Sequence, residues 1–96
     1  MFNIHLLTAA EDEFSAAYDW YQNQQSELDN KFYHEISHYL SIIEINLYQF
    51  PVKYSEEFRS ASINTFPFLI IYWIDEINQT VLVASIFHTS RDPKYF

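Results

Sequence analysis

The sequence has 96 residues, of which thirteen are acidic and five are basic, and its formal net charge is -8. This length predicts one domain over residues 1–96, and the acidic balance opposes non-specific binding to a phosphate backbone, which depends on Lys and Arg displacing counterions. Cysteine and glycine are both absent, which excludes disulfides, thiolate zinc sites and glycine-rich phosphate-binding loops.

The start of the chain predicts a short strand and no targeting segment. Phe2, Ile4 and Leu6 alternate with Asn3 and His5, a period that is typical of a strand. These residues lack the basic start and the long apolar run of a signal peptide, and no stretch of the chain approaches the roughly 18 apolar residues of a membrane span. Without cysteine the chain also suits a reducing compartment. We therefore expect a cytoplasmic protein that does not contact the membrane.

Two amphipathic helices are predicted to follow. The run from Thr8 to Glu11 reads as a capping box, with the Thr8 hydroxyl accepting from a backbone N–H and Glu11 reaching back. We expect a first helix of about four turns there, ending at the polar residues 22–26. Ser26, with Asp29 three residues later, is the predicted cap of a second helix, which Pro51 should stop.

One apolar stripe on the second helix indicates the position of the core. Its members recur at intervals of three and four residues: Leu28, Phe32, Ile36, Tyr39, Leu40, Ile43 and Leu47. Aromatic side chains at this period are normally core, so Phe32, Tyr39 and Phe50 are expected to pack against a sheet. Aromatic residues make up 20% of the chain, which favours a folded core over disorder.

Three strands are predicted after a charged connector at 51–57, over residues 58–63, 66–74 and 81–87, with residues 75–79 as a hairpin turn. Since glycine is absent, turns are expected to use Asn, Asp and Ser. The last two strands are apolar on both faces, and two helices can cover only one of them. We expect Leu82, Ala84 and Ile86, or their alternates, to form an exposed apolar patch that binds a partner or a second copy of the chain.

Few residues carry a recognisable chemical signature. The chain has no spacing typical of a Ser-His-Asp hydrolase, of paired catalytic carboxylates or of a metalloprotease. His34 and His38 are four residues apart on the second helix, a spacing that can chelate a metal, but a solvated helix face explains them better. We therefore expect neither a metal nor a cofactor.

The residues at the end of the last strand are the best candidates for a site. Cleavage of RNA needs a base for the ribose 2′-hydroxyl, cations for the phosphorane charge and an acid for the leaving group. Four side chains could supply these roles: Arg59, His88, Arg91 and Tyr95. In the alternative interpretation these residues are structural: Arg91 pairs with Asp92 or a helix acid, His88 caps the strand and Tyr95 packs.

The C-terminal third of the chain resembles the RelE/ParE superfamily of type II toxins. The resemblance rests on the segment from Phe66-Pro67-Phe68 to Tyr72, and on His88 followed by Arg91-Asp92-Pro93. The order of elements, one strand, two helices and three strands, is also that of the family. It implies an α/β (α+β) fold in which a helical hairpin packs on a four-stranded, mostly antiparallel sheet.

Within that family the sequence is more similar to the ParE-like branch, which includes plasmid stabilisation proteins, than to the ribosome-dependent messenger-RNA cleavers. The cleavers place an Arg after the aromatic residue of the third strand, where this chain has Leu69. Thr89 stands at one of their basic positions. Their catalytic face is rich in Lys, whereas the connector of this chain has only Lys53, beside Glu56 and Glu57. The ParE-like pattern includes Arg59 and the aromatic ending Tyr95-Phe96.

The resemblance implies a toxin that inhibits growth by binding DNA gyrase and is silenced by an antitoxin encoded beside it, which covers an apolar surface with a helix or strand. The implied target-binding residues are Arg59, His88, Arg91, Lys94 and Tyr95. Two alternatives stay open. One is a ribosome-dependent endoribonuclease that acts on messenger RNA, and the other is a degenerate, non-toxic interaction protein. A homodimer and a toxin-antitoxin hetero-oligomer are both compatible with the sequence.

Overall fold

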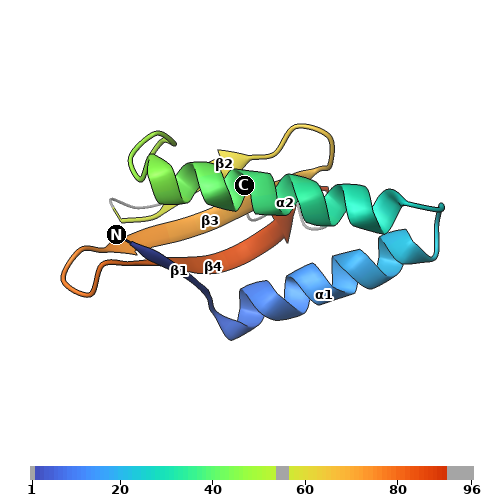
Figure 1. Ribbon diagram of the computed structural model, residues 1–96, viewed down its shortest axis with the longest axis horizontal. Helices are drawn as coiled ribbons and strands as arrows, with labels where there is room; N and C mark the ends of the chain where they lie inside the picture. The colour runs from blue at the N-terminus through green and yellow to red at the C-terminus, as the bar shows by residue number, and fades with distance from the viewer. Residues whose placement is uncertain (1, 54–56, 91–96) are drawn as a thin grey trace.

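The computed structural model describes residues 2–53 and 57–90. The elements are β1 (Asn3–Leu6), α1 (Thr8–Gln22), α2 (Leu28–Ile45), β2 (Arg59–Ser62), β3 (Phe68–Asp75) and β4 (Thr80–His88). The two helices form a hairpin that lies on one face of a four-stranded sheet (Figure 1). This arrangement confirms the predicted fold class and the predicted order of elements.

The strands lie in the order β1-β4-β3-β2. β3 pairs antiparallel with both β2 and β4, while β1 adds to the edge of β4 in parallel. β1 covers only residues 80–83 of β4, because Leu7, whose N–H donates to the Val83 carbonyl, leads directly into α1. The second half of β4 therefore has no strand beside it on that edge.

The core lies between the helices and the sheet, and its centre is aromatic. Phe32 of α2 has no exposed surface, and its ring centroid lies 5.3 Å from that of Phe66 and 5.0 Å from that of Phe68. Tyr21 of α1 closes the same cluster, 5.2 Å from Phe32. The apolar stripe predicted on α2 is thus confirmed, with Phe32, Ile36 and Ile43 buried and its other members packed around them.

Both predicted helix caps are wrong. Thr8 is the first helical residue and Leu7 is the cap, without a side-chain hydrogen bond, because pairing with β4 already orients Leu7. At α2 the cap is Glu27, again without a side-chain bond. The predicted stop is also misplaced, since α2 ends at Ile45 and not at Pro51.

The two positions with positive φ angles are not occupied by the residue types expected in turns. The positive φ angles of the described chain occur at Glu27, with φ 72°, and at Gln79, with φ 50°. Neither is Asn, Asp or Ser, so the expected choice of turn residues is wrong at these two positions. Glu27 joins the two helices, and Gln79 precedes β4 with its N–H bonded to the Glu76 carbonyl, so the tertiary connection sets both conformations.

A bulge in β4 changes which of its side chains face the helices. The register shifts between Ile71 and Tyr72, so Ala84 has no partner on β3. Val81 and Val83 face the helices, and beyond the bulge Ile86 does so as well, with 1% of its surface exposed. Neither predicted grouping, Leu82, Ala84 and Ile86 or their alternates, therefore lies on one face, because Leu82 faces away from the helices and Ile86 faces them.

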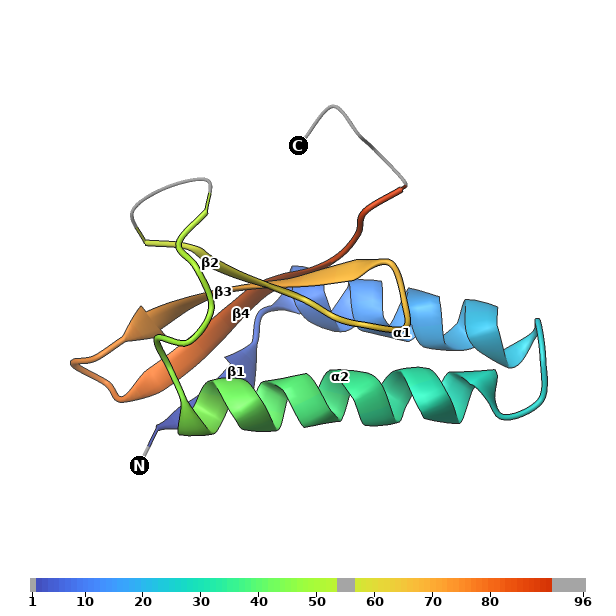
Figure 2. The same cartoon turned by 90° about the horizontal axis from the view of Figure 1, so that it is seen from above.

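The face of the sheet opposite the helices, here called the far face, has no helical cover among the described residues (Figure 2). It carries Leu69, Ile71, Trp73, Leu82 and Phe87. Leu69 is buried and the others are half-buried. The expected lack of a helix on this face is confirmed, but the expected exposure is not, because the large apolar side chains with the most exposed surface lie elsewhere: Trp20, Tyr33, Ile45, Tyr48, Val52 and Ile77.

Candidate functional site

Arg59 lies at the start of β2, where it holds the segment that leaves α2. One guanidinium nitrogen, Nη1, donates to the Phe50 carbonyl at 2.7 Å and to the Tyr48 carbonyl at 3.4 Å. The guanidinium also stacks on the Tyr48 ring, 5.0 Å from its centroid. Two donor contacts and one ring contact fix this side chain, so its charge is already engaged within the chain.

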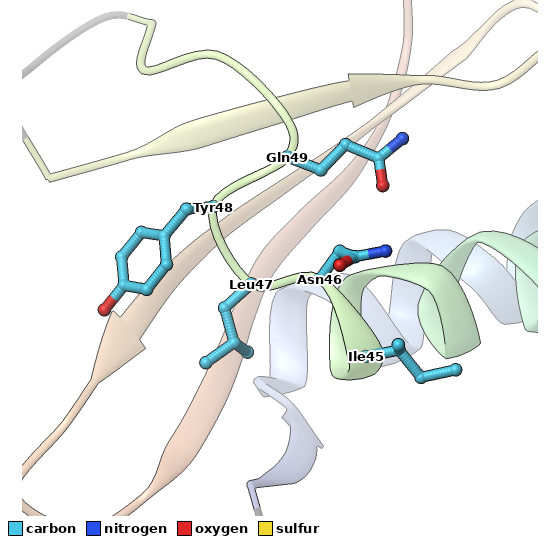
Figure 3. Close-up of a pocket in the computed structure, with 5 residues that line it drawn as sticks. All are labelled: Ile45, Asn46, Leu47, Tyr48 and Gln49. Carbon is cyan, nitrogen blue, oxygen red and sulfur yellow. The ribbon is translucent and has the colours of Figure 1, made fainter.

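Tyr48 links Arg59 to the β3-β4 turn. Its hydroxyl donates to Glu76 Oε1 at 2.7 Å, and this hydrogen bond is the main reason that the pKa of Tyr48 is raised above its usual value. Tyr48 lies in an open hollow of about 480 Å³ lined by residues 45–49, all of which follow one another at the end of α2 (Figure 3). Sequence reasoning missed this Arg59–Tyr48–Glu76 cluster, because its members are far apart in the chain.

We expect Arg59→Lys to lower the free energy of unfolding by about 1–2 kcal/mol, because an ammonium cannot reproduce the planar stacking and the shared donor geometry of the guanidinium. Urea denaturation measures the change. Lys31→Gln is the control, since it alters a cation that is exposed on α2 and should change stability by less than about 0.5 kcal/mol. A fully stable Arg59→Lys variant would show that the side chain is not needed for the fold.

Tyr72 anchors the same segment from the core. It has no exposed surface, and its hydroxyl donates to the Leu47 carbonyl at 3.2 Å. Burial is the main cause that raises the pKa of Tyr72, while the positive charge of Arg59 acts in the opposite direction. The protonated phenol is therefore the form that the folded chain favours.

Stability is expected to fall as the pH rises above about 10, the usual tyrosine pKa. Because the folded-state pKa of Tyr72 lies higher, its contribution is complete below that pH and is lost as the pH rises through the folded-state pKa. Tyr72→Phe should remove part of this alkaline loss. Urea titrations between about pH 8 and pH 11 test this, and equal alkaline slopes for the wild type and Tyr72→Phe would contradict it.

His88 ends β4, level with Phe68 at the start of β3, whereas Arg59 is level with Tyr72 in the middle of β3. Its ring meets that of Phe68 edge to face at 4.9 Å, and its Nδ1 accepts the Ser90 N–H at 3.2 Å. It borders a small hollow of about 240 Å³ together with Ala17, Trp20, Tyr21 and Phe68. Trp20 is 57% exposed there. Sequence reasoning did not single it out, although a tryptophan on a helix whose buried residues are Ala10, Ala17 and Tyr21 could have indicated an exposed aromatic side chain.

Arg59 and His88 do not meet. On β3, Arg59 is opposite Tyr72 and His88 is opposite Phe68, so four residues, or about 13 Å along the strand, separate their levels. They also lie on strands that flank β3 from opposite sides. The other candidates, Arg91, Lys94 and Tyr95, lie outside the described residues. The structure thus brings no two of the proposed site residues together within the described part of the chain.

The described part of the chain lacks the arrangements typical of a metal site and of a membrane span. No group of three or more His, Cys, Asp or Glu side chains there has the arrangement of a metal site. His34 and His38 are both exposed on α2. Neither described helix has the length and apolar character that crossing a bilayer requires.

Comparisons with known proteins give a structural match only. No family model matches the sequence, and no curated protein matches it. A solved structure described as the chromosomal ParDE toxin-antitoxin (TA) system from P. aeruginosa is similar, with a TM-score of 0.76 and 18% sequence identity. The match covers 92% of this chain and 96% of that chain. At this identity the likeness establishes the fold alone, and this is the fold that the sequence resemblance implied.

Proposed function

We propose that this chain is the toxin of a type II toxin-antitoxin system, that it acts by binding a cytoplasmic target such as DNA gyrase, and that a cognate antitoxin neutralises it. The observation that carries the proposal is the fold shared with a chain of a ParDE system over nearly the full length of both. The Phe66-Pro67-Phe68 and His88 to Pro93 motifs support it independently.

Binding is favoured over RNA cleavage by the positions of the candidate residues. A nuclease site needs its cations and its base within reach of one phosphate, but Arg59 and His88 lie on the two strands that flank β3, four residues apart along it. Arg59 is held by two carbonyl groups and a tyrosine ring. At the position after the third-strand aromatic residue, Leu69 is 5% exposed and apolar, so it offers no charge to a transition state.

The far face is the surface on which we expect an antitoxin to bind. Its half-buried side chains, including Trp73 and Leu82, have no helical cover within the described chain. A helix or strand laid over them would bury the remaining apolar area, which is a common mode of peptide recognition. A toxin-antitoxin hetero-oligomer is the assembly that this interpretation favours over a homodimer.

Induction of the chain alone in a bacterial host tests the proposal. Growth arrest is expected, and co-expression of the short open reading frame next to its gene should relieve the arrest. If growth continues although the folded chain accumulates, the chain is a non-toxic interaction protein of the same fold and the toxin proposal fails.

The target is tested in two parallel assays on the purified chain. Inhibition of gyrase supercoiling of a relaxed plasmid, without ribosome-dependent cleavage of messenger RNA, is the expected result. Cleavage that is lost in the double variant His88→Ala with Arg91→Ala would establish the endoribonuclease alternative. His34→Ala is the control, because it also removes a histidine but lies on the exposed side of α2.

A further inference from the structure

The helical hairpin carries most of the charge of the molecule. Residues 8–45 contain eight of the thirteen acidic side chains and only one of the five basic ones, Lys31, which gives them a formal charge of -7 out of -8 for the whole chain. α1 contains no Lys, Arg or His. A concentration of negative charge on these two helices attracts cationic partners and repels nucleic acids and anionic membranes.

A groove lies between the two helices. It has a volume of about 420 Å³ and is lined by Phe14, Ser15, Tyr18, Asp19, Asn30 and Tyr33, which together are called the hairpin groove here. The Phe14 ring lies 6.1 Å from the Tyr18 ring and 6.2 Å from the Tyr33 ring, centroid to centroid. Phe14 also stacks on the buried Phe32 at 5.4 Å. The aromatic lining of the groove is therefore held in place by the core.

The groove combines an accessible aromatic ring with a carboxylate that is not engaged. Tyr33 is 49% exposed, although it belongs to a helix that buries its neighbour Phe32 completely. Among the described residues the Asp19 carboxylate has no hydrogen-bond or ion-pair partner. Glu11 and Ser15 precede Asp19 by two turns and one turn on the same exposed side of α1. A cation can contact ring faces and a carboxylate at the same time here.

We infer that the hairpin groove docks a protein segment whose Lys or Arg side chains reach Asp19 and the rings of Tyr18 and Tyr33. Complementary charge selects this occupant, because the groove lining contains the Asp19 carboxylate and no basic side chain, and α1 carries four acidic residues and no Lys, Arg or His. A second copy of the chain is itself acidic and would bring only a few basic residues, which makes it a poorer occupant. This inference does not rest on the proposed toxin activity.

A synthetic amphipathic helix with Lys and Arg on one face and Leu on the other is a suitable probe. Its binding to the full chain is expected to weaken with added salt, and amide shifts in a two-dimensional NMR titration should centre on residues 14–19 and 30–33. A control peptide with Glu in place of every Lys and Arg should not bind. No detectable binding of the basic peptide, or shifts centred elsewhere, would overturn the inference.

Paired variants separate docking from general attraction. Asp19→Asn is expected to weaken binding by about two- to fivefold, whereas Glu44→Gln should change it little. Both remove one exposed charge, but Glu44 lies eleven residues beyond Tyr33, about 16 Å along α2 and past the screening length at physiological salt. Equal losses in the two variants would show attraction without a site, and this result would also overturn the inference.

The contribution of the ring is tested at Tyr33, whose partly exposed position lets the variants fold. Tyr33→Ala should weaken binding of the basic peptide by about two- to fivefold, and Tyr33→Phe should restore most of it because the ring face remains. Sedimentation of the free chain addresses self-association. A dimer of the wild type that Tyr33→Ala dissociates would show that a second copy is the occupant.

Discussion

Phe32→Ala is expected to lower the free energy of unfolding by about 3–5 kcal/mol, because it removes a fully buried ring and leaves a cavity. The ring is the centre of the aromatic core: it contacts Phe14 and Tyr21 from α1, and Phe66 and Phe68 from the sheet side. Its loss therefore affects both layers of the molecule together. Urea denaturation monitored by circular dichroism measures the change.

Tyr33→Ala is the matched control, since it removes an aromatic side chain from the next position of the same helix. Tyr33 is about half exposed, so its loss should cost well under half as much as the loss of Phe32. Equal losses would mean that the two neighbours are equally buried, which contradicts the orientation of α2 described above. A small loss for both would place the core elsewhere.

Glu13→Ala is expected to lower the free energy of unfolding by about 2–3 kcal/mol. Glu13 Oε1 accepts from the Ile86 backbone N–H at 3.0 Å and from the Ser85 hydroxyl at 2.8 Å. Ile86 lies in the half of β4 that β1 does not reach. The carboxylate of α1 thus takes the place of a neighbouring strand, and its removal leaves a partly buried backbone donor without an acceptor.

Two further variants separate this role from a general effect of charge. Glu13→Gln keeps an oxygen acceptor and should lose less stability than Glu13→Ala. Asp12→Ala alters an exposed acid on the same helix and should change stability by less than about 0.5 kcal/mol. Hydrogen exchange of the Ile86 amide gives a local readout, and it should be faster in Glu13→Ala than in Asp12→Ala. An unchanged exchange rate would show that Glu13 does not protect this edge.

The same contact bears on partner binding at the sheet edge. An unpaired strand edge is a template for pairing with another chain, and Glu13 occupies one of its donors in the isolated chain. The far face and the hairpin groove are not blocked in this way, since the first has no described helical cover and the second has the unengaged Asp19 carboxylate. These two surfaces are therefore the ones we expect partners to use.

Periodic features of the sequence predicted the fold well. The three- and four-residue repeat through Phe32, Ile36 and Ile43 located the buried face of α2, and the change of apolar period along the chain located the helices and the strands. These predictions are robust because burial of apolar area is the dominant favourable contribution to folding, and many residues along each element report the same face.

Features that depend on single residues were predicted poorly. The capping box at Thr8 satisfies a local pattern, but Leu7 is bonded to Val83 and becomes the cap. The bulge at Ala84 and the positive φ angle of Glu27 have no periodic signal. A hydrogen bond or a bulge changes the local energy by only about 1 kcal/mol, so tertiary contacts readily override the local preference.

By itself, the sequence determined the fold class, the order of the elements and the core, because the apolar residues of each segment recur with the period of a helix or a strand. It also placed Arg59 and His88 on strands beside β3. Only the tertiary structure decided that these two side chains lie far apart and that Arg59 is engaged by Tyr48 and Phe50. The register between strands and the path of the segment after α2 set such distances, and both arise from contacts between residues that are remote in the chain.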